Sequence, residues 1–308
     1  MSEEDNNSFE GNTRLCSCCA SCGITEIDDI KLVPCDDCDL IRYCSDECQN
    51  NHISEHEEDC NKKRAAELRD ELLFKQPESS DRGDCLICNL PLPLDMTNAI
   101  MGCCSKTICK GCIHANEKRQ DEMRLQHSCP FCRMPTPDSR EEGEKRNMKR
   151  AKANDPAALC HEGVKNYIKG HYSRSFEYWS KAAELGDAEA HFKLSMLYQT
   201  GEGVEKDIGK QIHHLEEAAI GGNPIARFHL GGHELKNGSA ERTVKHWIIA
   251  ATLGDNDSIK ALMDMFKGGF LGKEDLAAAL RAHKAAVDAT KSPQRKAAEE
   301  YYRKNNIH

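Results

Sequence analysis

The sequence predicts a multidomain fold in which two small cysteine-rich modules precede an all-α solenoid. Seventeen of the 18 cysteines lie between Cys16 and Cys132, while the rest of the chain is rich in alanine and holds only Cys160. That second part repeats with a period of 32 to 36 residues, which is typical of stacked helical units. Hydrophobic residues make up only 39% of the 308-residue chain and charged residues 30%, so we do not expect one large apolar core.

Composition and charge exclude several classes of function. No segment approaches the roughly 20 apolar residues of a membrane span, and the first residues lack the basic and apolar parts of a secretory signal. The net charge of −9 argues against general binding to a nucleic-acid backbone, which needs clustered Lys and Arg. We therefore expect an intracellular protein, of cytoplasm or nucleus, that binds neither a membrane nor nucleic acid. In that compartment cysteines indicate metal ligands before disulfides.

The first cysteine cluster contains four pairs of candidate metal ligands. They are Cys19 and Cys22, Cys35 and Cys38, Cys44 and Cys48, and His56 and Cys60. A C-x2-C pair places two thiolates on one tight turn, whereas residues four apart share a helix face. A helix from Cys48 to His56 would separate these two residues by about 12 Å of axial rise, too far for one ion. Two metals are therefore required, and each C-x2-C pair joins a different helical pair, although the spacing does not decide which.

The tail of this cluster, YCSDECQNNHISEHEEDC, resembles the MYND zinc finger, a small α+β fold with two zinc ions that binds short peptides. The resemblance implies the following ligands: Cys19, Cys22, Cys44 and Cys48 for one zinc, and Cys35, Cys38, His56 and Cys60 for the other. We expect His52 to pack and form hydrogen bonds rather than bind metal, because eight other ligands complete two tetrahedra. Cys16 and Cys18 are surplus, and either is an alternative to Cys19.

The second cluster resembles a RING finger, a cross-braced α+β fold in which the first and third ligand pairs share one zinc and the second and fourth share another. Three C-x2-C pairs and one adjacent pair of cysteines carry the resemblance. It implies these two sites: Cys85, Cys88, Cys109 and Cys112 for one zinc, and Cys103, Cys104, Cys129 and Cys132 for the other. With the first cluster, this makes about four zinc ions, two per finger.

One position departs from the usual RING pattern, because Lys106 stands where the family has a histidine ligand. Lysine is not a useful zinc ligand at neutral pH. We therefore assign Cys103 and Cys104 as the second pair, as in all-cysteine RING variants. His114 and His127 remain alternatives with less suitable spacing.

The RING resemblance also implies a function. In that family a hydrophobic residue of the first zinc loop, a proline near the last ligands and an arginine after the last cysteine contact a ubiquitin-conjugating enzyme and its ubiquitin. Ile87, Pro130 and Arg133 stand at these positions. Such a protein supplies no nucleophile and acts by positioning the charged thioester. The sequence thus predicts a RING-type ubiquitin-protein ligase. A non-enzymatic, zinc-dependent adaptor or scaffold, in which these residues only pack or are solvated, is the alternative.

The repeating part is marked by an alanine-rich phrase and a glycine before Asp187, Asn223 and Asp255, and Asp155 lies one interval earlier. Asp155, Asp187, Asn223 and Asp255 are spaced by 32, 36 and 32 residues. The unit from Asp187 resembles the Sel-one-like repeat, a relative of the tetratricopeptide repeat, with Ser195 in place of the family's first glycine. The resemblance implies two-helix units that stack on their neighbours and bind a protein partner, here the substrate of the ligase.

The predicted boundaries follow from these assignments. Ser292 and Pro293 suit the N-cap and first turn of a last helix, which we expect to cap the stack. We interpret Trp179 and Trp247 as core packing. The predicted segments are a disordered N-terminus (1–15), the MYND finger (16–60), a helix and linker (61–84), the RING finger (85–133), a charged linker (134–153), the repeats (154–290) and the capping helix (291–308). Neither the substrate, the cognate conjugating enzyme nor the oligomeric state follows from the sequence.

Overall fold

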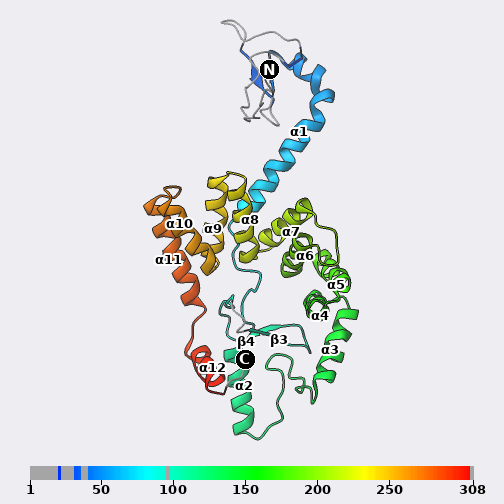
Figure 1. The fold of residues 1–308 in the computed structure, drawn as a ribbon, viewed down its shortest axis with the longest axis vertical. Coiled ribbons are helices and arrows are strands. Elements are labelled where there is room, and N and C mark those ends of the chain that lie inside the picture. The colour runs from blue at the N-terminus through cyan, green and yellow to red at the C-terminus, as the bar shows by residue number, and fades with distance from the viewer. Residues whose placement is uncertain (1–19, 22–30, 36–40, 95–97, 306–308) are drawn as a thin grey trace, which may run out of the picture. The chain divides into compact units, whose positions relative to one another are not determined.

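The computed structural model describes residues 20–21, 31–35, 41–94 and 98–305 (Figure 1). The chain divides into two compact units, Met1–Leu72 and Leu73–His308. Within the described residues, none of the helices combines the length and the apolar character needed to cross a membrane.

The first unit has a core made largely of candidate metal ligands. A two-stranded antiparallel sheet of β1 (Val33–Pro34) and β2 (Arg42–Tyr43) precedes helix α1 (Asp46–Phe74). The amide of Cys48 donates to Ser45 Oγ at 3.3 Å, which satisfies one free N–H group at the helix start. Among its described residues, the buried side chains are Leu32, Cys35, Tyr43, His56 and Cys60. Three of these five residues, Cys35, His56 and Cys60, are of types that bind zinc.

The second cysteine cluster forms a compact module at the start of the second unit. Strands β3 (Asn98–Ile100) and β4 (Thr107–Cys109) form an antiparallel hairpin that leads into α2 (Lys110–Glu122). Cys109 caps this helix, since the amide of Cys112 donates to Cys109 Sγ at 3.4 Å. Leu92 and Ile108 are buried with three cysteines in the core of the module.

The rest of the second unit is helical. The helices, shown in order along the arc in Figure 1, are α3 (Arg140–Lys152), α4 (Pro156–Ile168), α5 (Tyr172–Glu184), α6 (Ala188–Thr200), α7 (Ile208–Ile220), α8 (Pro224–Lys236), α9 (Ala240–Thr252), α10 (Asn256–Lys267), α11 (Lys273–Ala289) and α12 (Pro293–Lys304). From α3 to α10, each helix packs against the next, as expected for a solenoid.

The repeated Asp and Asn residues serve as N-caps. Asp155, Asp187, Asn223 and Asp255 begin α4, α6, α8 and α10, and each side chain accepts a hydrogen bond from the amide three residues on. The period in the sequence therefore records where the first helix of each unit starts.

Two tryptophan–glycine pairs pack the two helices of a unit tightly against each other. Trp179 donates from Nε1 to the carbonyl of Cys160 at 3.1 Å. Its indole leaves no room for a side chain on Gly163, because a Cβ there would lie 2.3 Å from Nε1. Trp247 and Gly231 repeat this arrangement two units later, again at 2.3 Å. In the unit between them the corresponding residues are Gln211 and Ser195. Ser195 is thus tolerated where the bulky indole is replaced by Gln211.

The segment that connects α1 to the cysteine module runs along the solenoid. We call residues 75–84 the strap. Arg227 of α8 is fully buried and donates to the backbone carbonyls of Leu73, at 2.6 Å, and Lys75, at 3.3 Å. Further along, the amide of Asp81 donates to the carbonyl of Gly222 at 3.1 Å. A segment predicted as helix and linker is therefore held in place by long-range hydrogen bonds.

Two other expectations differ from the structure. The predicted charged linker contains α3, whose Asn147 and Ala151 are buried and which packs on α4. The last helix begins at Ser292 and Pro293 as predicted, but it does not cap the stack. Helix α11 packs on α9 and α10, whereas α12 packs on α2 of the cysteine module. There the ring of Tyr301 stacks on that of His114, with centroids 4.4 Å apart.

Candidate metal centres and the surface beside them

Four cysteines of the second cluster converge on one point. Cys85, Cys88, Cys109 and Cys112 have all four sulfurs within 4.8 Å of one another. The sulfurs of Cys85 and Cys112 are 3.9 Å apart, as are those of Cys88 and Cys109. Zinc–sulfur bonds of about 2.3 Å give a tetrahedron with edges of about 3.8 Å, whereas a disulfide brings sulfurs to about 2.05 Å. The geometry fits four thiolates on one zinc.

A second set of four cysteines has the same geometry. Cys103, Cys104, Cys129 and Cys132 lie within 4.8 Å of one another. The sulfur–sulfur distances are 4.0 Å for Cys103 to Cys104, 3.9 Å for Cys104 to Cys129 and 3.4 Å for Cys132 to Cys103. The adjacent cysteines Cys103 and Cys104, which the RING resemblance implies as the second pair, can therefore both face one ion.

The alternative histidine ligands lie in other contacts. His114 stacks on Tyr301, and His127 Nε2 is 2.7 Å from Asp121 Oδ1. Neither histidine belongs to a group of candidate ligands in the described part of the chain. Lys106, at the position of the family's histidine, is exposed.

The first C-x2-C turn forms a backbone knuckle, which we define as residues 85–92. The amide of Cys85 donates to Leu90, and that of Asn89 to Cys85, at 3.0 and 2.8 Å. Burial raises the pKa of the Cys85 thiol, but backbone N–H groups, including that of Cys109 at 3.5 Å, outweigh it and lower the pKa to about 7. A thiol so prepared loses its proton readily to a metal.

The last C-x2-C turn forms an equivalent second knuckle, residues 129–135. The amide of Cys129 donates to Met134 and that of Arg133 to Cys129, at 2.8 and 2.9 Å. Asn89 and Arg133 take the same place in the two knuckles, with φ of +53° and +60°. Arg133 thus occupies a conformation that non-glycine residues seldom adopt, and the two backbone bonds hold it there.

The tips of the two knuckles present the predicted contact residues. Ile87 is 42% exposed, Pro130 is half-buried and Arg133 is exposed. Sequence reasoning missed two more apolar residues at the tips, Leu86 and Phe131, which are 47% and 43% exposed. Their signal was available, since they are the remaining residues inside the two C-x2-C turns.

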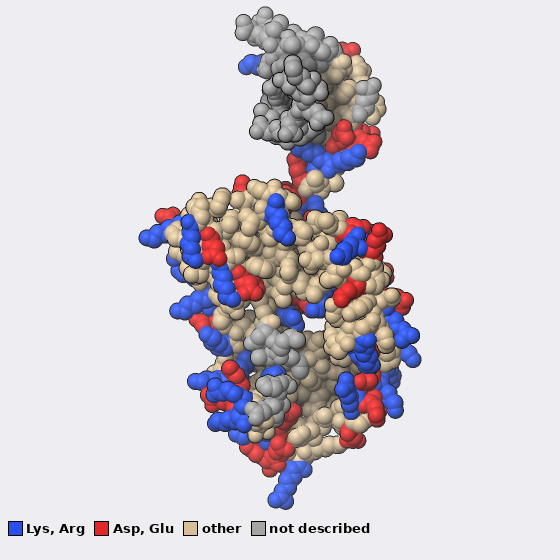
Figure 2. Space-filling model, in the orientation of Figure 1, with Lys and Arg blue, Asp and Glu red and all other residues tan. Residues whose placement is uncertain are grey.

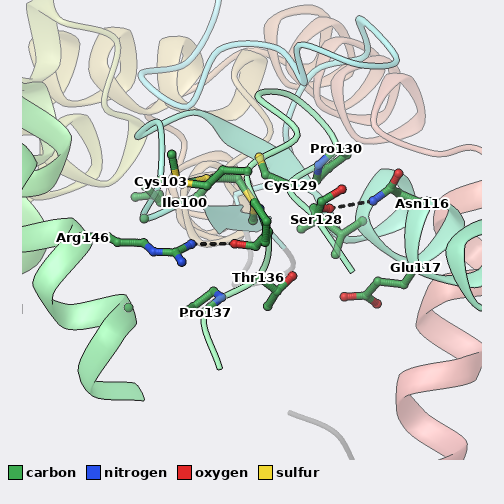
Figure 3. Close-up of a pocket in the computed structure, with 16 residues that line it drawn as sticks. Ile100, Cys103, Asn116, Glu117, Ser128, Cys129, Pro130, Thr136, Pro137 and Arg146 are labelled. Carbon is green, nitrogen blue, oxygen red and sulfur yellow. Dashed lines mark hydrogen bonds between the residues drawn. The ribbon is translucent and has the colours of Figure 1, made fainter. Parts of the chain in front are cut away.

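Helix α3 anchors the second site from outside the cysteine segment. Arg150 Nε donates to Ser105 Oγ at 2.7 Å, on the loop that follows Cys104. Arg146 Nη1 donates to the carbonyl of Pro135 at 2.6 Å (Figure 3). A cavity of about 250 Å³ lies between α3 and the module, with Arg146, Asn116 and Pro130 in its lining (Figure 3). Its Asn116 and Arg146 side chains already donate to backbone carbonyls of the protein, and we assign the cavity no ligand.

The first unit brings together the described part of the other ligand set. Cys35, His56 and Cys60 are buried, with their ligand atoms within 4.8 Å of one another. The sulfurs of Cys44 and Cys48 are 3.6 Å apart. His52 lies beside them, with Nδ1 3.2 Å from the hydroxyl of Tyr43. The remaining predicted ligands and alternatives, Cys16, Cys18, Cys19, Cys22 and Cys38, lie outside the described residues.

Charge on the surface is mixed. On the face drawn in Figure 2, acidic and basic side chains of the second unit are interspersed rather than gathered by sign. That face therefore offers no continuous basic surface of the kind that follows a nucleic-acid backbone.

Two family models match the chain: the MYND finger over residues 16–60, and the Sel1 repeat over residues 159–187 and 188–223. Neither match covers residues 85–132. No curated protein matches. The crystal structure of a Sel1 repeat protein from Oxalobacter formigenes is similar, at 22% identity over 57% of this chain and 71% of that chain, with a TM-score of 0.44.

The chain therefore carries a MYND zinc finger and a helical solenoid of Sel1 repeats, both modules of protein–protein interaction. Both expectations from the sequence are confirmed at this level. The solenoid continues past the matched residues, because Asn223 and Asp255 cap α8 and α10 as Asp187 caps α6.

Proposed function

We propose that the chain is a RING-type ubiquitin-protein ligase in which residues 85–133 bind a ubiquitin-conjugating enzyme. The observation that carries the proposal is the interleaving of the four ligand pairs, since the first pair lies with the third and the second with the fourth. A cross-braced RING finger has this arrangement of ligand pairs. Zinc at each set of four thiolates would cross-link the segment into two rigid loops.

The tips of the two knuckles form the surface that contacts the conjugating enzyme. Ile87 and Pro130 offer apolar contact to the conjugating enzyme, and Leu86 and Phe131 enlarge that surface. Arg133 follows the last ligand, and its exposed guanidinium can donate to both the enzyme and ubiquitin. The amine of a substrate lysine attacks the thioester, so the chain contributes position and no nucleophile. The Sel1 repeats, and the MYND finger through a peptide, recruit the substrate.

The MYND finger takes part as a second zinc-dependent module. By family resemblance we assign its ligands as Cys19, Cys22, Cys44 and Cys48 for one ion and Cys35, Cys38, His56 and Cys60 for the other. The contacts among the described ligands support this grouping.

Self-ubiquitination of the full chain with a broad panel of conjugating enzymes tests the proposal. We expect activity with at least one enzyme, and a loss of about tenfold or more for Ile87→Ala or Arg133→Ala. Ile168→Ala and Arg140→Ala are matched controls, because both side chains are highly exposed and lie outside the cysteine module.

The second candidate function is a non-enzymatic adaptor that joins partners of the MYND finger to partners of the repeats. The two family matches favour it, because both matched modules bind proteins. A folded, zinc-loaded chain that is inactive with every conjugating enzyme would support the adaptor and contradict the ligase.

A further inference from the structure

Arg295, in the first turn of α12, joins the end of the solenoid to the first knuckle. Its Nη1 donates to the carbonyl of Thr290, which ends α11, at 2.7 Å, and to that of Pro91 at 2.6 Å. Its Nη2 donates to the carbonyl of Leu90 at 3.0 Å and lies 3.4 Å from Cys88 Sγ. One guanidinium thus holds two carbonyls and a candidate zinc ligand of a loop about 200 residues earlier in the chain.

Helix α12 approaches α2 closely in its first turn and again near its end. A Cβ on Gly111 would stand 2.9 Å from the Cα of Arg295, so glycine is needed at this position of α2. Further along, Tyr301 stacks on His114, and Lys110 Nζ lies 5.5 Å from the ring centroid of Tyr302. The first candidate metal site is therefore bordered by α12 both at its knuckle and at the start of α2.

The chemistry of the site explains why arginine suits this place. Four thiolates on one zinc carry a net charge of −2, and a guanidinium beside them offsets part of it. The planar fork of arginine also reaches carbonyls and sulfur together, which the single ammonium of lysine does not do.

We propose that Arg295 is a positioning residue that holds the first knuckle in the geometry in which Ile87 meets the conjugating enzyme. The C-terminal helix is then a working part of the RING surface rather than a cap on the repeats. The role toward the conjugating enzyme rests on the proposed ligase function, whereas the role in ordering the knuckle does not.

The test compares Arg295→Ala and Arg295→Lys with Arg303→Ala in the zinc-loaded full chain. Arg303 is the matched control, because it is exposed in the last turn of the same helix. Three measurements apply: amide hydrogen exchange of residues 85–92, the rate of zinc transfer to a chromogenic chelator, and the KM and kcat of ubiquitin transfer from the charged conjugating enzyme.

We expect Arg295→Ala to speed exchange in the knuckle and release of one zinc equivalent by about tenfold, with Arg295→Lys between it and the wild type. We also expect KM for the charged enzyme to rise about tenfold while kcat is kept. A merely structural loss would instead lower kcat through the folded fraction. The proposal is overturned if Arg295→Ala exchanges the knuckle amides and releases zinc at the rates of the wild type. A fall in kcat at unchanged KM would also overturn it.

The two proposals fail in different ways. If the wild-type chain binds no conjugating enzyme, the ligase proposal fails. In that case, exchange and zinc release still decide whether Arg295 orders the knuckle.

Discussion

Asn223 of α8 donates a hydrogen bond from Nδ2 to Oδ2 of Asp81, 2.7 Å away and 142 residues earlier in the chain. The same Asn223 caps α8 through its Oδ1, which accepts from the amide of Ala226 at 2.9 Å. One side chain therefore starts a repeat and fastens the strap to it. The carboxyl group of Asp81 is buried among other charges, and its titration can be measured.

Stability should depend on pH through Asp81. Burial raises the pKa of this carboxyl to about 6; Glu189 and Asp187 also raise it, while Arg82 and the bond from Asn223 oppose the rise. The folded state thus holds the proton more tightly than the unfolded state, and the free energy of unfolding falls as pH rises from about 4 to 6. The loss is about 2–3 kcal/mol. Asp81→Asn removes the ionised form and should be more stable than the wild type at pH 7.5.

The difference between the two proteins is the quantity to measure, because other groups titrate in the same range. Burial lowers the pKa of His214 to about 4, which destabilises the fold as pH falls. Urea unfolding of both proteins between pH 5 and 7.5 should show that the difference in their free energies of unfolding becomes smaller toward pH 5. A difference that is constant with pH would contradict a raised pKa of Asp81.

Removal of metal should unfold the MYND finger and the cysteine module of residues 85–132, and the repeats should stay folded. We expect about four zinc equivalents in the purified chain, each site contributing about 10–16 kcal/mol of apparent binding free energy. Chelation should unfold residues 85–132 and release α12 from α2, while α4 to α11 keep their helicity because their cores contain no candidate zinc ligand.

Metal analysis, circular dichroism and limited proteolysis check this expectation, with zinc re-addition as the control. Collapse of all helical signal on chelation would contradict the independence of the repeats. Markedly fewer than four equivalents, or disulfides found by mass spectrometry, would contradict the ligand assignment.

A methyl group at Gly163 should disrupt the contact between α4 and α5. A Cβ there would lie 2.3 Å from Nε1 of Trp179, so the indole must move and its bond to Cys160 is lost. We expect Gly163→Ala to lower the free energy of unfolding by about 1–3 kcal/mol. Gly232→Ala is the matched control: a Cβ there meets nothing within 4 Å, so the change should stabilise α8 by about 0.5–1 kcal/mol. Equal effects in denaturant unfolding would refute the packing argument.

Local features of the fold could be predicted from the sequence, because they depend on residues close together in the chain. The N-caps at Asp187 and Ser292 need only a side chain and an amide three residues on. The C-x2-C turns likewise place Cys85 beside Cys88, and the tips of those turns carry Ile87 and Pro130. The same argument failed for α12, since nothing near Ser292 records which surface the helix will meet.

The sequence by itself determined the composition of the modules: the ligand pairs, the period of the repeats and the helix that begins at Pro293. Only the tertiary structure decided that Arg295 reaches Cys88 and that Arg227 holds Leu73. The physical reason is distance along the chain. A cap or a knuckle is closed by neighbouring residues, whereas these arginines meet partners more than 150 residues away, and those meetings depend on how successive repeats stack.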